Sequence, residues 1–461
     1  MDDIRGIRGV ELMSTSLKCV SGVSTDSRSV SRGQLFFALK GENFDGHSYV
    51  SDALAKGAAC AVVDRKWYMS SEHSSAQPFA VVDDTTKALG DLARIYRRKF
   101  DMPVIAVGGS NGKTTTKEMV GRVLARKYRV AKTAANHNNQ IGVPLTIFDM
   151  RKSHEAAVVE IGTNHFGEIQ RLCEILEPSA GLITNIGNEH LEFFGDLDGV
   201  EKEEGMLFGF LAKTKGTAFV NTDDSRIIGL SKAVRHRFTY GFQGGSRRNL
   251  SARLFGFDSR GCALFEIKFE GKTELVHLNV PGIHNAMNAL AAAAVGIRYG
   301  VGHRDVKRAL ETFKSYEKRM QILKIAGVTI LNDTYNSNPE SAIAALRWMS
   351  MVRSRGKRIA VLADMLELGG ASMREHQRVG GEVANEKVDR LFTFGEMARD
   401  IAAGADGGAE TESFSDKREL SEKLLKTVRP GDVVLVKGSR GMKMEEVVDA
   451  LISGLEAGRT Q

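Results

Sequence analysis

Short apolar runs separated by polar stretches dominate the first part of the chain. Residues 34–39 (QLFFAL) and 58–63 (AACAVV) have the length and composition of buried strands. Residues 49–56 lie between them and predict a helix, which a glycine follows. The polar stretch 64–77 predicts a loop. Residues 1–84 are therefore expected to form a small α/β domain.

Strands and amphipathic helices alternate in the next part. Apolar residues at helical spacing predict a linking helix over residues 85–100. Buried strands are predicted at residues 104–107, 156–159 and 181–184, with a helix after the first. Such alternation favours a parallel sheet with helices on both faces. We assign this sheet to a central domain, residues 85–317.

A second, smaller alternation fills residues 318–461. Its strand candidates are residues 329–331, 358–362, 390–394 and 432–436. Residues 402–409, rich in glycine and alanine, predict a surface loop. The pattern predicts a Rossmann-like α/β domain. A chain of 461 residues also suits three domains, at roughly 100–200 residues per domain.

Composition narrows the class of protein. The formal net charge is +7, but no dense Lys/Arg run is interleaved with aromatic residues, so we expect no nucleic-acid partner. No stretch approaches the ~20 apolar residues that span a bilayer, so we expect no membrane insertion. Four cysteines lie far apart without CxxC spacing, which argues against a zinc site and suits a reducing cytosol. We expect a cytoplasmic monomer.

The strongest local motif is GGSNGKTTT at residues 108–116, between a predicted buried strand and an amphipathic helix. This context predicts a phosphate-binding loop, because glycines and a helix N-terminus let backbone N–H groups converge on phosphate. Lys113 would neutralise the β- and γ-phosphates of ATP, and the Thr114 hydroxyl would bind Mg²⁺. The general pattern places its first glycine where this chain has Val107. The residues expected around ATP are Gly108, Ser110, Asn111, Gly112, Lys113, Thr114 and Thr115.

Two further residues follow predicted strands of the same sheet. Glu160 ends the strand at residues 156–159, where a metal-binding carboxylate belongs in a phosphate-loop protein. His190 follows the strand at residues 181–184 and could reach the same crevice. Glu160 is therefore a candidate metal-binding residue, and His190 is a candidate residue of the same crevice. Read alone, each would be an ordinary polar residue at a strand end or in a loop.

Longer strings give the chain a family resemblance. The first part carries STDSR, GQLFFAL and GENFDGH at residues 24–28, 33–39 and 41–47. The central part carries NHNNQIGVP, EIGT and GIHNAMNAL at residues 136–144, 160–163 and 282–290. The last part carries NDTYNSNP, DMLELG and LVKGSRGMK at residues 332–339, 364–369 and 435–443. Together they resemble the Mur ligase family over nearly the whole chain.

The resemblance implies an ATP-dependent ligase of peptidoglycan precursor synthesis. ATP would phosphorylate the terminal carboxylate of a UDP-N-acetylmuramoyl-tripeptide, and the amine of D-Ala-D-Ala would attack the acyl phosphate to give amide, ADP and phosphate. Asn285 and Asn336 would lie near the base, Asp333 near the ribose and Arg319 near a phosphate. Two Mg²⁺ ions would be held at Thr114, Glu160 and His190. The residues expected to bind the other substrates are Ser27, Arg28, Asn43, Asp45, His47, Asn136, Asn138, Asn139 and Thr163.

The family's architecture implies that ATP lies between the central and last domains, with a hinge near residues 316–319. Two alternatives stay open. One is a related ligase that adds diaminopimelate or lysine to a shorter precursor, or glutamate to folate; the C-terminal strings argue against it. The other is a phosphate-loop ATPase acting on a macromolecule, against which the missing basic–aromatic patch argues.

One position departs from the family. Most Mur ligases carry a carbamylated lysine fourteen residues after the metal-binding histidine, and here that residue is Glu204. We expect Glu204 to supply permanently the negative charge that supports Mg²⁺ in catalysis. The rival is Lys202, but two residues turn a helix by about 200°, so Lys202 would point away. A third interpretation places Glu204 on an acidic surface turn.

Overall fold

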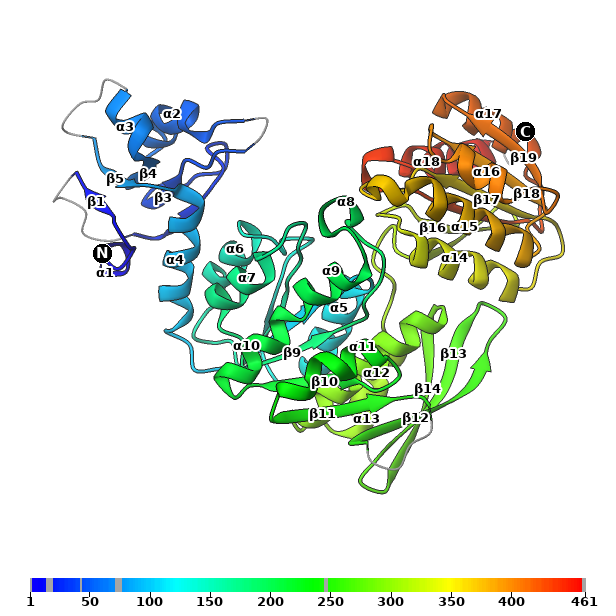
Figure 1. The fold of residues 1–461 in the computed structure, drawn as a ribbon, viewed down its shortest axis with the longest axis horizontal. Helices are drawn as coiled ribbons and strands as arrows, with labels where there is room; N and C mark the ends of the chain where they lie inside the picture. The colour runs from blue at the N-terminus through cyan, green and yellow to red at the C-terminus, as the bar shows by residue number, and fades with distance from the viewer. Residues whose placement is uncertain (1, 14–19, 42–43, 71–76, 244–247, 458–461) are drawn as a thin grey trace. The chain divides into compact units, whose positions relative to one another are not determined.

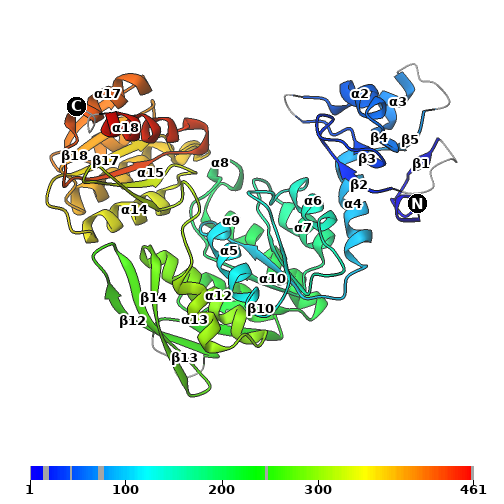
Figure 2. The ribbon, with the colours of Figure 1, turned by 180° about the vertical axis from the view of Figure 1, so that it is seen from behind.

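The computed structural model describes residues 2–13, 20–41, 44–70, 77–243 and 248–457. Its strands form three sheets of five, nine and six strands (Figures 1 and 2). The chain folds into two compact units. Unit 1 comprises Met1–Ala106, Tyr128–Thr163 and Gly167–Gly181; unit 2 comprises Val107–Lys127, Asn164–Phe166 and Leu182–Gln461.

The five-stranded sheet belongs to unit 1. In the order β1-β5-β4-β3-β2 its strands are Glu11–Leu12, Phe79–Val82, Cys60–Asp64, Gln34–Phe37 and Gly22–Ser24. All neighbours are parallel except β1 and β5. The helix predicted at residues 49–56 is present as α2 (Val50–Ala55), after the 3₁₀ turn η1 (Gly46–Tyr49); α1 is Asp2–Arg5. The predicted strands in this part are confirmed.

The loop predicted over residues 64–77 is partly wrong. Helix α3 (Arg65–Ser70) occupies its beginning, and residues 71–76 lie outside the described part. The Asp64 carboxylate accepts a 2.7 Å hydrogen bond from the Trp67 backbone N–H, which starts the helix. Trp67 packs edge-on against Phe79. Tertiary packing thus makes a helix from a stretch that is polar overall.

The helix predicted at residues 85–100 is α4 (Thr85–Arg97), with Asp84 as its N-cap. It packs on α6 (Gly142–Phe148) and α7 (Glu168–Leu176) within unit 1. Gly90 allows the close approach, because a Cβ there would lie 2.7 Å from Cδ1 of Ile175. The helix is therefore docked along its length rather than a free linker.

The nine-stranded sheet has the order β14-β13-β12-β11-β10-β9-β6-β8-β7. The strands predicted by their apolar runs are β6 (Val104–Gly108), β8 (Ala156–Glu160) and β9 (Ala180–Ile183). The others are β7 (Val130–Lys132), β10 (Thr217–Asn221), β11 (His236–Gly241), β12 (Leu250–Phe257), β13 (Cys262–Phe269) and β14 (Lys272–Pro281). Strands β12–β14 are antiparallel, so the sheet is mixed rather than purely parallel.

Helices line the sheet near the phosphate loop. The longest of them, α12 (Ile283–Arg298), packs tightly against α5 (Lys113–Leu124). Gly296 permits this contact, since a Cβ there would lie 2.2 Å from Cγ1 of Val123. The remaining helices of this region are α10 (Met206–Thr214), α11 (Ser225–Leu230), the 3₁₀ turn η2 (Ser231–Ala233) and α13 (His303–Glu311).

The six-stranded sheet confirms the predicted Rossmann-like part. In the order β15-β16-β20-β17-β18-β19 its strands are Gln321–Ile325, Val328–Asp333, Val433–Lys437, Arg358–Ala363, Arg390–Phe394 and Glu410–Phe414. All pairs are parallel except β15 with β16. One core contains residues of α14 (Pro339–Met351), α15 (Ser372–Asn385) and α16 (Arg399–Gly404). The other contains residues of α17 (Lys417–Thr427) and α18 (Glu445–Ala457).

The loop predicted over residues 402–409 is partly wrong, because α16 extends to Gly404. Ile401 and Ala405 are buried in the core with α14 and α15, which stabilises the helix despite its small residues. Gly380 and Gly404 bring α15 and α16 together at backbone distance. Glycine here serves close packing rather than a loop.

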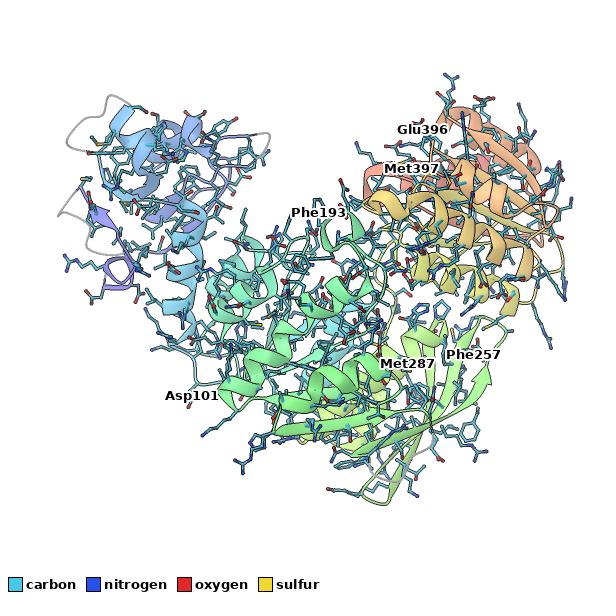
Figure 3. All side chains as sticks on the ribbon, in the orientation of Figure 1. Asp101, Phe193, Phe257, Met287, Glu396 and Met397 are labelled. Atoms are coloured by element: carbon cyan, nitrogen blue, oxygen red, sulfur yellow. The ribbon has the colours of Figure 1, made fainter. Side chains whose placement is uncertain are left out.

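The segment after β9 joins the C-terminal core. It contains α8 (Leu191–Phe194) and α9 (Leu197–Glu204). Leu191, Phe194 and Val200 are buried in the same hydrophobic cluster as residues of α14 and α15, whereas the neighbouring Phe193, labelled in Figure 3, is exposed. All these residues belong to unit 2. The segment that carries His190 therefore packs into the core of the C-terminal sheet.

Candidate nucleotide and metal site

The phosphate loop connects β6 to α5 and depends on two glycines. Gly109 and Gly112 have φ values of +109° and +80°, which L-residues rarely adopt. A Cβ at Gly109 would lie 2.4 Å from Oγ1 of Thr184, and one at Gly112 would lie 2.7 Å from Oδ1 of Asn288. Both positions therefore require glycine for conformation and for space.

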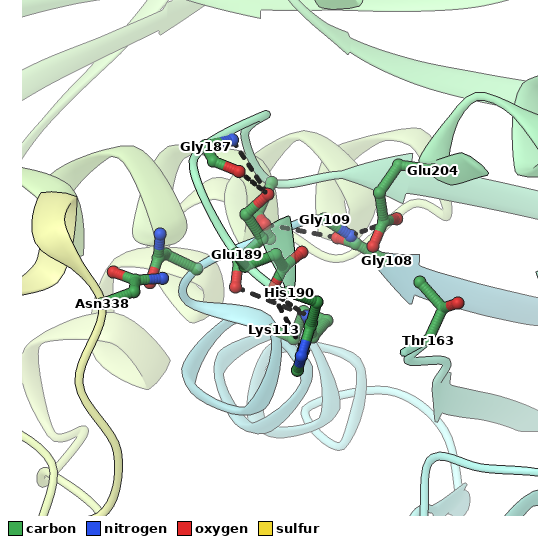
Figure 4. A network of polar contacts seen from close by, with 12 residues as sticks. Gly108, Gly109, Lys113, Thr163, Gly187, Glu189, His190, Glu204 and Asn338 are labelled. Atoms are coloured by element: carbon green, nitrogen blue, oxygen red, sulfur yellow. Dashed lines mark hydrogen bonds and ion pairs between the residues drawn. The ribbon is translucent and has the colours of Figure 1, made fainter. Parts of the chain in front are cut away.

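The loop is fastened to the segment that follows β9 (Figure 4). The Ser110 N–H donates to the Asn185 carbonyl at 2.9 Å. The Asn185 side chain accepts from the Asn111 N–H at 3.1 Å and donates to the Asn111 carbonyl at 2.8 Å. Ser110 Oγ donates to the Gly187 carbonyl and accepts from the Gly187 N–H. These bonds fix the loop before any ligand binds.

Lys113 lies at the start of α5 with its ammonium group near an acid. Its Nζ is 3.4 Å from the Ser110 carbonyl and 3.4 Å from Oε2 of Glu189. Glu189 is buried, and its Oε1 has no hydrogen-bond partner among the described residues. Glu189 was not among the site residues predicted from the sequence. Glu189 directly precedes the candidate His190 in the sequence. An acidic residue in a loop, however, belongs to no helical or strand pattern that could indicate a functional role.

Glu204 lies at the same loop. Its carboxylate is completely buried, and its Oε2 accepts a 2.7 Å hydrogen bond from the Gly109 N–H. Oε1 has no hydrogen-bond partner among the described residues. Burial raises the pKa of Glu204 to about 7; Lys113 opposes the rise and Glu189 adds to it. The surface-turn interpretation of Glu204 is therefore wrong.

Lys202 lies on a different side of α9. It is exposed, and its Nζ is 5.6 Å from the ring centroid of Phe166. The rotation expected from helix geometry thus separates Lys202 from the phosphate loop, where Glu204 lies.

His190 is fixed by an unusual backbone and by acids. Its φ of +49° is left-handed, and it caps α8. Its Nδ1 is 2.5 Å from Oε2 of Glu367, and its Nε2 is 3.9 Å from Oε2 of Glu189. The close contact with His190 lowers the pKa of Glu367. His190, Glu189 and Lys113 therefore form a continuous polar chain, drawn in Figure 4.

Asn338, which was not among the predicted site residues, joins the C-terminal part to the phosphate loop within unit 2. Nδ2 of Asn338 donates to Oδ1 of Asn111 at 2.9 Å. Asp333 is buried, accepts from the Met320 N–H and pairs with Lys437 at 2.6 Å. The Lys437 ammonium also donates to the carbonyl of Asn336.

Arg319 lies in the connection to the C-terminal sheet. Its guanidinium carbon is 3.7 Å from the ring centroid of Tyr335. Its neighbours Lys318 and Met320 are both left-handed, with φ of +62° and +47°. Two non-glycine residues in this conformation mark a specifically held connection.

Asn285 connects helix α12 to the phosphate loop. Its side chain donates to the Pro281 carbonyl and accepts from Asn288, the residue that Gly112 abuts. The neighbouring His284 has its pKa lowered to about 4, because burial outweighs the attraction of Asp333. The nucleotide candidates Asn285, Asp333 and Asn336 are therefore all tied into local networks.

The other central candidates lie in unit 1. Glu160, at the end of β8, is buried and accepts a 2.9 Å hydrogen bond from Nδ2 of Asn138. Oγ1 of Thr163 donates to Glu168 at 3.1 Å. Asn139 accepts from N–H groups at the start of α6, and Asn136 is exposed. The structure thus pairs two of these candidates, Asn138 and Glu160, directly.

The first sheet carries the remaining candidates. Arg28 is exposed and pairs with Asp26 at 2.8 Å, while Ser27 is buried. His47 is buried: Nδ1 bonds Asp45 at 2.6 Å, and Nε2 accepts from the Asp64 N–H at 3.0 Å. Both nitrogens of the ring make hydrogen bonds within the protein, so the ring stabilises the conformation of its loop. Asn43 lies outside the described residues.

The residues at the phosphate loop suit a hard cation. In the part of the chain that the structure describes, no three His, Cys, Asp or Glu side chains form a ready-made metal cage. Two buried carboxylate oxygens without hydrogen-bond partners, on Glu189 and Glu204, nevertheless lie beside the loop. Mg²⁺ prefers oxygen ligands and usually keeps several waters and substrate phosphates, so a partial protein site fits it.

Together, a strand, a glycine loop, a helix and a lysine beside a buried carboxylate define a phosphate-loop nucleotide-binding protein. Family models match the chain at residues 19–97 (Mur ligase family, catalytic domain), 107–296 (Mur ligase middle domain) and 318–440 (Mur ligase, glutamate ligase domain). The chain belongs to the Mur ligase family, and its three-domain α/β fold is that of the family.

Individual relatives support the assignment to this family. The chain is 36% identical to the UDP-N-acetylmuramoyl-tripeptide–D-alanyl-D-alanine ligase of Bacillus subtilis, over 94% of this chain and 93% of the relative. It is 34% identical to the ligase of that name from Escherichia coli, over 94% of each chain. MurF from Acinetobacter baumannii has a similar structure (TM-score 0.89, 30% identity, 98% of each chain). So does MurF ligase from Thermotoga maritima in complex with ADP (TM-score 0.84, 27% identity, 96% and 99%).

Proposed function

We propose that this protein joins D-alanyl-D-alanine to a UDP-N-acetylmuramoyl-tripeptide, using ATP, in the synthesis of the peptidoglycan precursor. The relatives named above carry that activity in their names and match over nearly their whole length. The reaction breaks the bond between the β- and γ-phosphates of ATP and forms an acyl phosphate on the tripeptide. The dipeptide amine then displaces phosphate, leaving an amide.

The observation that carries the proposal is the arrangement around Lys113. A glycine loop presents backbone N–H groups at the N-terminus of α5, which favours phosphate. The Lys113 ammonium, now near Glu189, would neutralise charge on the transferred phosphoryl group. Because the loop is already fastened to residues 185–187, little reorganisation is needed on binding.

Mg²⁺ is part of the proposal. When bound, it would neutralise phosphate charge during transfer. Thr114, His190, Glu204 and Glu189 lie at the phosphate loop or the adjoining polar chain, and Glu160 would add a carboxylate by the family resemblance. Glu204 would provide a permanent carboxylate where relatives modify a lysine.

The remaining assignments follow the same proposal. Asn285, Arg319, Asp333 and Asn336 would surround the nucleotide. The loops with Ser27, Arg28 and residues 43–47 would hold the UDP portion. Asn136, Asn138, Asn139 and Thr163 would face the muramoyl peptide. The division at residues 84/85 and 317/318, the hinge near residues 316–319, a cytoplasmic location and a monomeric state also stay predictions. For the described residues, no helix is long and apolar enough to cross a membrane.

A product assay tests the proposal and its alternatives. The protein is offered ATP, Mg²⁺, D-Ala-D-Ala and either the diaminopimelate- or the lysine-containing tripeptide, and products are read by mass spectrometry. The expected result is a UDP-linked pentapeptide with one ADP per amide, and the preferred tripeptide identifies the third residue. Ligation of a single amino acid instead, or ATP hydrolysis stimulated only by a macromolecule, would contradict it.

A further inference from the structure

Glu367 and His190 face one another from loops far apart in the sequence, and both have strained backbones. Glu367, in the string DMLELG after β17, has a φ of +64°, and His190 has a φ of +49°. Neither is a glycine. Left-handed non-glycine residues persist only where the surrounding structure holds them, and they concentrate at functional sites.

Backbone and core contacts hold the two loops together. The N–H of Glu192, in α8, donates to the Glu367 carbonyl at 3.2 Å. A Cβ on Gly369 would lie 3.0 Å from Cα of Glu192, so the chains touch at backbone distance. Leu191 and Leu368 are buried in one hydrophobic cluster. The contact between α8 and residues 364–369 is therefore packed rather than incidental.

The side chains give this contact a chemical consequence. Oε2 of Glu367 is 2.5 Å from Nδ1 of His190, and the pair makes a close ionic contact whose angles are not those of a hydrogen bond. A carboxylate so close to Nδ1 favours a proton on that nitrogen over a lone pair. A neutral imidazole protonated at Nδ1 carries its lone pair at Nε2, the atom that lies on the side of Glu189 and Lys113. A carboxylate on the far nitrogen is the usual way in which a metal-binding histidine is oriented.

We propose that Glu367 is a positioning residue for the ion site. It selects the Nδ1–H tautomer of His190 and turns Nε2 toward the phosphate-loop group, so that the C-terminal domain contributes to cation binding without touching the cation. This rests on the proposed role of His190 as a metal ligand. The loop of residues 364–369 thereby links docking of the C-terminal domain to completion of the site.

The first test observes the tautomer directly. The full chain, labelled with ¹⁵N-histidine, is studied near pH 8 without nucleotide or metal, and His190→Gln assigns the His190 signals. The Nδ1–H tautomer is expected in wild type and in Glu367→Gln, whose amide oxygen can take the place of the carboxylate oxygen beside Nδ1. Glu367→Ala should shift His190 toward Nε2–H, and Glu192→Ala, an exposed neighbour in α8, should not. An Nε2–H or doubly protonated wild-type ring, or an unchanged Glu367→Ala, would overturn the proposal.

The second test measures ion affinity. Mn²⁺ is titrated with ADP present and followed by electron paramagnetic resonance. Loss of such an orienting partner typically weakens metal binding by about 10–100-fold, so we expect that loss in Glu367→Ala, near-wild-type affinity in Glu367→Gln, and no change in Glu192→Ala. Equal affinities in wild type and Glu367→Ala, in a protein that makes the pentapeptide, would refute the inference alone. Absence of the pentapeptide in wild type would refute the proposed function, independently of the tautomer result.

Discussion

The backbone N–H of Gly109 in the phosphate loop donates a 2.7 Å hydrogen bond to Oε2 of the buried Glu204, ninety-five residues later. A side chain from α9 therefore supports the loop that is proposed to cradle ATP. Lys113 and Glu189 lie close enough to influence the pKa of Glu204. This relationship is the basis of the first two predictions.

Glu204, not Lys202, is expected to be essential. Glu204→Ala removes a buried carboxylate next to the phosphate loop and should reduce turnover by about a hundredfold or more, as expected for an electrostatic group of the site. Lys202→Ala removes an exposed ammonium and should leave turnover close to wild type. Steady-state assays with and without bicarbonate check both. Dependence on carbon dioxide together with loss of activity in Lys202→Ala would contradict the assignment.

Ionisation of the buried Glu204 carboxyl group should also lower the free energy of unfolding at high pH. Its folded pKa, about 7, lies above the ordinary value of 4.5. The unfolded chain therefore releases this proton first, and the cost grows as pH rises from 4.5 and is complete above 7. Relative to wild type, Glu204→Gln should gain on the order of 3 kcal/mol between those limits in the ligand-free protein.

The measurement is urea unfolding followed by Trp348 fluorescence in a Trp67→Phe background, near pH 5 and pH 8. Trp348 is buried in the core of the C-terminal sheet, within the same unit as Glu204. Glu192→Gln, an exposed acid in α8, serves as the control and should show no such pH trend. A stability difference between Glu204→Gln and wild type that is the same at both pH values would contradict the account.

Lys113 is expected to act in transfer rather than in folding. Lys113→Ala should lower turnover by about a hundredfold or more, because one electrostatic group at a developing charge contributes about 3–4 kcal/mol. The variant should keep its thermal unfolding profile, since the loop is fastened by bonds of Ser110 and Asn111. Turnover near wild type would remove the phosphate-loop assignment.

Arg319 is expected to serve ATP and not the UDP substrate. Its stacking on Tyr335, between two left-handed residues, places the guanidinium in a defined position in the connection to the C-terminal sheet. Arg319→Ala should raise the KM for ATP and leave calorimetric binding of the UDP-tripeptide unchanged. A comparable loss of UDP-tripeptide affinity without ATP would argue against this role.

Local patterns predicted much of this fold. Apolar runs and glycine positions are local features of the sequence. They determine the strand, loop and helix at residues 104–124 and the four C-terminal strands. The fixed spacing from His190 also identified Glu204, whose burial beside Gly109 the structure then revealed. Strands β12–β14 were not predicted. Buried and exposed residues alternate along much of β14, and polar or charged residues interrupt the apolar residues in all three strands.

Long-range contacts account for what the sequence could not predict. Glu189 meets Lys113 across 76 residues, and no local rule places an acid of a loop beside a lysine of a helix. Glu367 meets His190 only because α8 packs into the C-terminal core. His47 lies in the string GENFDGH, and both nitrogens of its ring make hydrogen bonds within the protein, to Asp45 and Asp64. Tertiary packing determines these three contacts, and local sequence patterns do not predict them.

Oxygen transfer tests the central claim most directly. The tripeptide is labelled with ¹⁸O in its terminal carboxylate and incubated with ATP, Mg²⁺ and D-Ala-D-Ala, and mass spectrometry reads both the peptide and the released phosphate. An acyl-phosphate ligase moves one carboxylate oxygen to phosphate, so the account predicts singly labelled phosphate in equal amount to the UDP-linked pentapeptide. Unlabelled phosphate, or phosphate release without the pentapeptide, would contradict it.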